Sequence, residues 1–237
     1  MNTIIRVLTS LRTTNILTGL LIILLVAGAF IMPTNPSYRT INQMGLFMWL
    51  KGAPLSATWW LYGSMAVLVL LVINTLACSA ESLIKKQSGR NLLLVISPQI
   101  IHIGFCFIML AHLISSASAF HLYGVLYQGA VAVLPDGQQI RLDRINYETS
   151  QGYIVWMEAE LGVKDRSGID RVLKIAPNKP GLISGVGVYL KQISLNPVPR
   201  ALIEVSYEPG AKWALVGGLL FALGTVLLVI LKLIIER

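Results

Sequence analysis

Charged residues are scarce in this sequence. Only 13% of its 237 residues are charged, whereas 55% are hydrophobic. A soluble domain carries about a quarter of its residues as charges. Too few polar side chains are present to cover a water-exposed surface of this size. The composition therefore argues against an ordinary soluble domain and predicts an integral membrane protein.

Cysteine and histidine are scarce too, since the sequence contains two cysteines and three histidines. Neither Cys78 nor Cys106 falls in the segment that we expect to be exported, so no disulfide framework is predicted. We expect both thiols to be small buried hydrophobic groups. Residues 122–211 contain no histidine and no cysteine. This segment therefore lacks a Ser/His/Asp triad, a Cys/His pair and a His/Cys metal cluster, and an independent hydrolase is not expected.

Four apolar runs without a charged residue are present. They cover residues 15–32, 59–80, 92–111 and 213–231. At 1.5 Å per helical residue, runs of about 18 to 22 residues span roughly 27 to 33 Å, the thickness of the hydrocarbon layer. Lipid offers no hydrogen-bond partner to a backbone, so these runs must be helices. The sequence predicts four transmembrane helices.

The first run has an alternative interpretation. Arg6 and Arg12 precede an apolar stretch that leads to Ala27-Gly28-Ala29, and this order resembles a secretory signal with a small-residue cleavage site. The apolar stretch is long for a signal. We therefore expect it to remain in the protein as a membrane helix.

The cations predict the orientation. Seven of them flank one set of helix ends, and only Arg39, Lys51 and Lys212 lie close to the other set. By the positive-inside rule the richer side is cytoplasmic, so both termini are expected in the cytoplasm of a bacterial cytoplasmic (inner) membrane. The net charge of +8 then meets anionic lipid headgroups, and no nucleic-acid partner is expected. The seven flanking cations are Arg6, Arg12, Lys85, Lys86, Arg90, Lys232 and Arg237.

Residues 119–211 differ sharply from the rest. Short β-branched and aromatic stretches alternate with turn signals such as Pro135-Asp136-Gly137 and Ser150-Gln151-Gly152. These patterns predict one small extracytoplasmic (periplasmic) antiparallel β domain, a sandwich or barrel, between helices 3 and 4. The predicted division is 1–118 for three helices, 119–211 for the β domain and 212–237 for the last helix. The predicted strands cover 131–134, 139–142, 153–161, 172–175, 186–193 and 201–207.

The three histidines lie within twenty residues of one another. His102, His112 and His121 all fall on or just beyond the third predicted helix. A membrane histidine either bridges helices by a hydrogen bond or ligates a cofactor such as haem iron. His102 and His112 are ten residues apart, about 15 Å along a helix, so they cannot ligate opposite faces of one porphyrin. Cys106 shares the helix face of His102. If His102 binds haem, a second axial ligand must come from another helix or chain.

Two further features lie at the helices. Trp59, Trp60 and Tyr62 stand where an aromatic belt at the membrane–water interface is expected, with cofactor stacking as the alternative. In the last helix Gly218 and Ala222 form a small-xxx-small pair, and Gly217 and Gly224 repeat at seven residues. This side is predicted to pack tightly, and Gly218→Leu is predicted to weaken either association with the partner or packing against the other helices.

Several segments together resemble the ResB (CcsB) family. In the membrane, these are Trp59-Trp60-Leu61-Tyr62 leading to Leu71–Cys78, and the helix start at His102-Ile103-Gly104. The exported segment shows the family's order of motifs and is much shorter than in many relatives. Ser56-Ala57-Thr58 stands where an acidic residue is usual. The exported motifs are Gly137–Leu142, Gly152–Asp165, Pro177-Asn178-Lys179-Pro180, Gly187-Val188-Tyr189 and Glu208-Pro209-Gly210.

The resemblance implies a role in System II cytochrome c biogenesis. It implies an accessory haem-channel subunit of a cytochrome c synthase, without catalysis of its own, that helps export haem and present it to apocytochrome c. The implied partners are a ResC/CcsA-like membrane protein and apocytochrome c, and the implied cofactor is haem b, held transiently. His102 matches the membrane histidine proposed to ligate haem. His112 and His121 are weaker candidates without a match in the family.

Two other functions stay open from the sequence. In a purely structural anchor or scaffold subunit, the histidines would only bridge helices. A small-molecule transporter subunit is a third class. Four helices with few polar groups beyond Gln99, His102 and His112 make a poor polar path for it.

Overall fold

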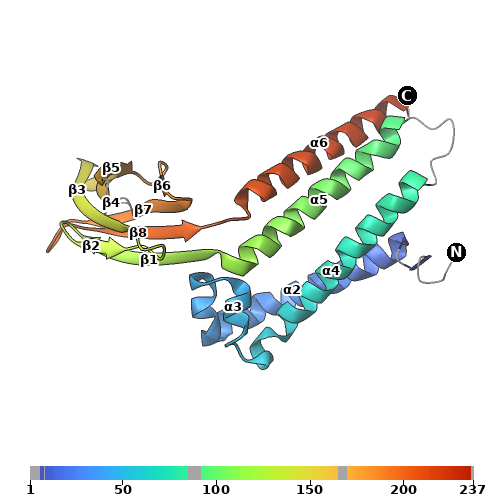
Figure 1. The fold of residues 1–237 in the computed structure, drawn as a ribbon, viewed down its shortest axis with the longest axis horizontal. Helices are drawn as coiled ribbons and strands as arrows, with labels where there is room; N and C mark the ends of the chain where they lie inside the picture. The colour runs from blue at the N-terminus through green and yellow to red at the C-terminus, as the bar shows by residue number, and fades with distance from the viewer. Residues whose placement is uncertain (1–5, 8, 85–91, 165–169, 236–237) are drawn as a thin grey trace. The chain divides into compact units, whose positions relative to one another are not determined.

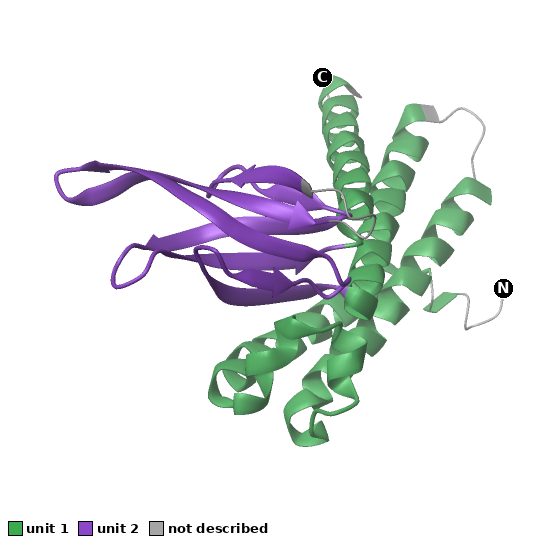
Figure 2. Cartoon of the chain, turned by 60° about the vertical axis from the view of Figure 1, so that its left-hand side comes forward, with its two compact units in different colours: residues 1–118, 209–237 green, residues 119–208 purple. Residues whose placement is uncertain are grey.

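The computed structural model describes residues 6–7, 9–84, 92–164 and 170–235. They form two compact units, residues 1–118 with 209–237, and residues 119–208. Figure 2 draws them in green and purple. The first unit is helical, and the second is built of antiparallel strands (Figure 1). The predicted fold class, four membrane helices with a small antiparallel β domain between helices 3 and 4, is confirmed.

Within the described residues, four helices are long and apolar enough to cross a membrane. Each is longer than its predicted apolar run, because the helix continues through flanking residues that include Arg12, Glu81 and Lys212. Pro33 does not stop the first helix and lies in its last turn. Of the cations that predict the orientation, Lys85, Lys86, Arg90 and Arg237 lie outside the described residues, and the orientation stays a prediction. The helices are α2 (Leu11–Thr34), α4 (Leu55–Ile84), α5 (Leu92–Ser118) and α6 (Ala211–Ile235).

The connection between α2 and α4 folds into two short helices. The 3₁₀ helix η1 (Pro36–Gln43) begins at a proline, and the side chain of Asn35 caps it by accepting from the Ser37 N–H at 3.0 Å. The second is the short helix α3 (Leu46–Leu50). Pro54 immediately precedes α4, where proline is tolerated.

α2 and α4 form an antiparallel pair. Near one end, Gly28 lies under the ring of Trp60, so close that a Cβ on Gly28 would overlap the ring. Near the other end, the Thr14 hydroxyl donates to Asn74 Oδ1 at 2.6 Å. Asn74 is almost fully buried, and the hydrogen bond offsets the cost of burying its amide.

An aromatic cluster joins this pair to the connection. Tyr38, Trp49 and Trp60 are all buried, and the ring centroids of Tyr38 and Trp49 are 5.0 Å apart. The Trp60 indole N–H donates to the Tyr38 hydroxyl at 2.9 Å, and that hydroxyl donates to the Ala57 carbonyl at 2.7 Å. Trp59 and Tyr62 are exposed, as an interfacial belt requires. The belt prediction is wrong for Trp60, which is a core residue.

α5 and α6 form the second antiparallel pair, at closer range. A Cβ on Gly217 would lie 2.7 Å from the Gly104 carbonyl oxygen, and one on Gly104 would lie 2.6 Å from the Phe221 backbone nitrogen. Gly224 is equally tight against α5. Nothing lies within 4 Å of a Cβ on Gly218. Tight packing within the chain therefore holds for Gly217 and Gly224 and is wrong for Gly218, for which contact with a partner stays a prediction.

The β unit is a sandwich of two four-stranded sheets, in the orders β1-β8-β7-β6 and β2-β3-β4-β5. Its core contains the inward residues of both sheets, such as Leu142, Leu161 and Val188. The Gln151-Gly152 turn joins β3 to β4, with positive φ at both residues, as a two-residue hairpin requires. The strands are β1 (Phe120–Tyr127), β2 (Val131–Val133), β3 (Gln139–Ser150), β4 (Tyr153–Lys164), β5 (Asp170–Ile175), β6 (Gly181–Ile183), β7 (Val186–Ser194) and β8 (Arg200–Tyr207).

Two of these strands are absent from the sequence prediction. β1 follows α5 after one residue, and its apolar residues read as a continuation of the helix. β6 is three residues long, too short to show alternation. β1 pairs with β8 along its whole length, from Phe120 opposite Tyr207 to Tyr127 opposite Arg200. This pairing makes β8 a central strand.

Candidate functional site

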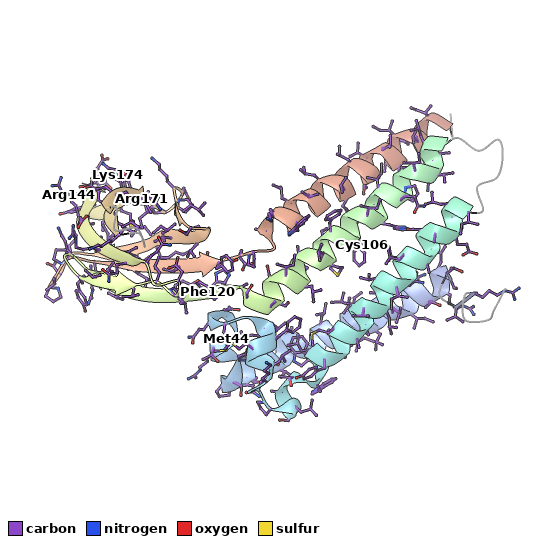
Figure 3. All side chains as sticks on the ribbon, viewed as in Figure 1. Met44, Cys106, Phe120, Arg144, Arg171 and Lys174 are labelled. Atoms are coloured by element: carbon purple, nitrogen blue, oxygen red, sulfur yellow. The ribbon has the colours of Figure 1, made fainter. Side chains whose placement is uncertain are left out.

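An apolar groove of about 370 Å³ lies between α4 and α5. Among the lining residues, only His102 has ring nitrogens. Figure 3 labels another lining residue, Cys106, on α5. The residues of α5 that line it recur at helical spacing and so share one face. The lining residues are Leu76, Ser79 and Leu83 of α4 and Gln99, His102, Ile103, Cys106, Phe107 and Leu110 of α5.

The imidazole of His102 is held from α4. Its Nδ1 lies 2.7 Å from the hydroxyl oxygen of Ser79. Within the described residues, no hydrogen bond involves Nε2 of His102. When Nδ1 carries the proton and donates it to Ser79, Nε2 carries the lone pair and can accept or ligate. In metal sites, a hydrogen bond of this kind on the ring nitrogen that does not bind the metal orients the histidine ligand.

His102 stands well inside the third helix, as the charge-free run of residues 92–111 predicts. α5 begins at Leu92, so His102 stands ten residues in, about 15 Å along the axis. The polar segment around Pro98 does not end the helix, because a helix in lipid must keep its backbone hydrogen bonds internal. His102 therefore lies near the middle of α5.

The groove's own residues offer one imidazole. Cys106 follows His102 at one helical turn on the same face, and both cysteines are free thiols. In the part of the chain that the structure describes, no group of three His, Cys, Asp or Glu residues could hold a metal ion. A ligand on the opposite face of a flat macrocycle would have to come from outside this groove.

His112 and His121 do not join His102. His112 is exposed on α5 and does not line the groove. His121 lies on β1 in the other unit, and not on the helix. The structure therefore brings none of the three predicted site histidines together. Ser79 was not singled out by the sequence, because an isolated serine in a membrane helix carries no pattern.

His121 belongs to a charged cluster on the β unit. Its Nδ1 lies 2.9 Å from Glu204 Oε1, and its Nε2 lies 2.8 Å from Glu208 Oε1. Carboxylates only accept, so both contacts are hydrogen bonds when the ring carries two protons. The hydrogen bond to Glu204 raises the pKa of His121, burial opposes it, and Glu208 adds to the rise. Glu204 lies on β8 and is buried.

Lys191 of β7 completes this cluster. Its Nζ lies 2.5 Å from Glu204 Oε2 and 5.5 Å from the centre of the Tyr189 ring. Burial of Glu204 raises its pKa, but hydrogen bonds from Lys191 and His121 prevail and hold it below its usual range. The hydrogen bond to Glu204 raises the pKa of Lys191, and the nearby hydroxyls of Tyr123 and Tyr189 add to the rise.

The cluster predicts a pH-dependent stability. A histidine whose folded pKa is raised contributes stability fully below its unfolded pKa, near 6.5, and loses it as the pH rises through the folded pKa. His121→Gln should therefore lower the melting temperature of the full chain in detergent near pH 6, and the difference from wild type should shrink towards pH 9. The measurement is thermal unfolding followed by circular dichroism in the β-sheet region. His112→Gln is the control, and a difference that stays constant with pH would contradict the assignment.

No protein-family model and no curated protein match the chain. Among solved structures, the cytochrome c haem lyase CcmF is similar, with a TM-score of 0.46 and 17% sequence identity over 88% of this chain. The chain spans 34% of that protein's chain.

Proposed function

We propose that this chain is an accessory membrane subunit of a cytochrome c synthase that binds haem in the α4–α5 groove while the haem is being exported and attached to apocytochrome c. The observation that carries the proposal is His102, whose Nδ1 contacts Ser79 and whose side chain lines an apolar groove. The ResB-like motifs of the sequence support the same function. The chain would not catalyse attachment on its own.

The groove's residues suit haem b. Iron takes a neutral imidazole nitrogen, and the apolar surroundings of His102 penalise the charged ring. Leu76, Ile103, Phe107 and Leu110 offer an apolar wall to a flat macrocycle. When bound, the iron would supply an attachment point, and the chain's residues would orient the macrocycle and exclude water.

A partner is part of the proposal. One imidazole fills one axial position, and Cys106 projects from the same helix face as His102. The second axial ligand would therefore come from a membrane partner of the ResC/CcsA type. The β unit would lie in the periplasm and hold the partner or apocytochrome c.

The test is cytochrome c maturation in cells that depend on this chain. His102→Ala should lower maturation strongly without lowering the amount of the chain in the membrane. Added imidazole should restore part of the activity, because it can occupy the vacated ligand position. His112→Ala is the matched control on the same helix and should mature cytochrome c normally. Full maturation by His102→Ala would remove the ligand role and leave the structural-anchor function in its place.

A further inference from the structure

Most edges of the two sheets are protected against pairing with another chain. An edge strand exposes a row of backbone N–H and C=O groups, and folded proteins protect such rows with short strands, charged side chains or bulges. The edge strands β2 and β6 are three residues long, and the edge strand β5 carries Arg171 and Lys174. β3, β4 and β7 extend beyond these shorter strands, and a shift of register interrupts each of the extensions.

β1 is an edge strand without these protections. It is eight residues long, contains no Lys, Arg, Asp, Glu or Pro, and pairs with β8 without a register shift. Its one basic side chain, His121, is engaged by Glu204 and Glu208. No described strand pairs with its other side (Figure 1). The one segment of this unit outside the described residues, 165–169, connects β4 to β5 in the other sheet.

The middle of β1 is open to a neighbour. Gly124 is exposed, and nothing lies within 4 Å of a Cβ built on it. Tyr123, Val125 and Tyr127 stand at alternate positions and therefore on one face of the strand. Their side chains are 64%, 54% and 45% exposed. A strand added here would meet a backbone edge and, beside it, three apolar or aromatic side chains.

The complement of this edge is an extended, uncharged stretch of polypeptide, because only a backbone repeats donors and acceptors at the spacing of a strand. A second copy of this chain is a constrained partner. β1 follows the membrane helix α5 after one residue in every copy, so an antiparallel pair of β1 strands would have to lie flat along the membrane. A chain without a membrane anchor has no such constraint.

Of the two partners in the proposed function, apocytochrome c fits this requirement better. A folded protein protects its own strand edges, so an unfolded stretch supplies the complement most readily. Apocytochrome c still lacks the haem that would stabilise its folded state, since a ligand that binds only the folded form shifts the equilibrium towards that form.

We propose that β1 is a docking edge, at which an extended apolar segment of apocytochrome c adds as a further strand to the sheet β1-β8-β7-β6. This inference rests on the proposed function, in which apocytochrome c is the client. Main-chain hydrogen bonds to β1 supply affinity, and Tyr123, Val125 and Tyr127 favour apolar side chains at alternate positions of the client. The added strand holds the client extended while haem is attached.

The test measures binding of fluorescently labelled, haem-free apocytochrome c to the full chain in detergent, by anisotropy. Tyr123→Lys/Val125→Lys should weaken binding about tenfold, because it removes two apolar cross-strand pairs and puts charge on the edge. Val131→Lys/Val133→Lys is the matched control. It places two lysines at the same spacing on the edge strand β2, where both valines are exposed, and should bind as wild type does. All four side chains are exposed, so both variants should unfold at the wild-type temperature.

A second measurement on the wild-type chain needs no variant. Apocytochrome c should slow deuterium exchange of the amides of residues 120–127 and leave residues 131–133 unchanged, because each new main-chain hydrogen bond protects an amide. A client held by side chains alone would leave exchange in β1 unchanged, and that result would overturn strand addition.

The remaining outcomes separate this inference from the function on which it rests. Equal binding by both lysine variants would place the client elsewhere and overturn the docking edge, and haem binding through His102 would stand. A wild-type dimer that Tyr123→Lys/Val125→Lys converts to a monomer would assign the edge to a second copy and overturn the inference as well. Absence of binding to the wild-type chain, with maturation still dependent on His102, would defeat the docking edge alone. Full maturation by His102→Ala would instead remove the haem-binding function.

Discussion

Gly217→Leu is expected to separate α6 from α5. The new Cβ would lie 2.7 Å from the Gly104 carbonyl oxygen and 2.8 Å from the Ile108 backbone nitrogen. These are backbone atoms of a continuous helix, and they cannot turn aside as a side chain would. Inserting bulk into a packed site costs about 1–3 kcal/mol or more. We expect the upper end of that range, because the helices meet through backbone contacts on both sides.

Gly218→Leu is the matched control, one position along the same helix. Nothing lies within 4 Å of a Cβ there, so the chain alone should tolerate leucine. The measurement is thermal unfolding of both variants in the same detergent. A similar loss of stability in both variants would contradict the α5–α6 contact described here.

Trp60→Ala is expected to loosen α2 from α4 and to release the aromatic cluster. The substitution removes the ring that covers Gly28 and the N–H that donates to Tyr38. Replacing a buried tryptophan by alanine costs about 3–5 kcal/mol in soluble cores. The Tyr38 hydroxyl loses the hydrogen bond that it accepts and keeps the one that it donates to the Ala57 carbonyl, which adds a smaller loss.

Its neighbour supplies the control. Trp59 is 48% exposed and Trp60 is 5% exposed, so Trp59→Ala removes a ring of the same size from the surface. The measurement is thermal unfolding in detergent, where Trp59→Ala should stay close to wild type. If Trp59→Ala were the more destabilising, the assignment of Trp60 to the core would be wrong.

The helices and most strands follow from the sequence, because lipid and a sandwich core impose strong patterns. The four charge-free runs are too long and too apolar for helices of a soluble domain, so each must be a membrane-spanning helix. On β4, Ala159, Leu161 and Val163 are buried in alternation with Glu158 and Glu160. Period-two burial of this kind is what a one-sided strand requires.

Strands without that alternation escape prediction. β1 is apolar on both faces and directly follows a membrane helix. Glu204 is buried because β1 and β7 flank it with His121 and Lys191. These neighbours lie 83 and 13 residues away in the sequence, so no local pattern reveals them.

The candidate site shows the same limit. The sequence selects His102, since an ionisable group inside a membrane helix is costly. It does not reveal Ser79, because the contact depends on how α4 lies against α5. The sequence also indicates which face of α6 carries the close contact. It points to Gly218, whereas the neighbouring Gly217 makes that contact. Small-residue spacing alone does not identify which of two adjacent glycines meets a neighbour.

The central claim is that His102 Nε2 ligates haem iron in the α4–α5 groove. The most direct measurement is pulsed electron paramagnetic resonance of ferric haem bound to the full chain, with all histidines labelled with ¹⁵N. Wild type and His112→Ala should both show hyperfine coupling to an imidazole ¹⁵N, and His102→Ala should lose it. Coupling that persisted in His102→Ala and vanished in His112→Ala would place the ligand on another face of α5 and contradict the account.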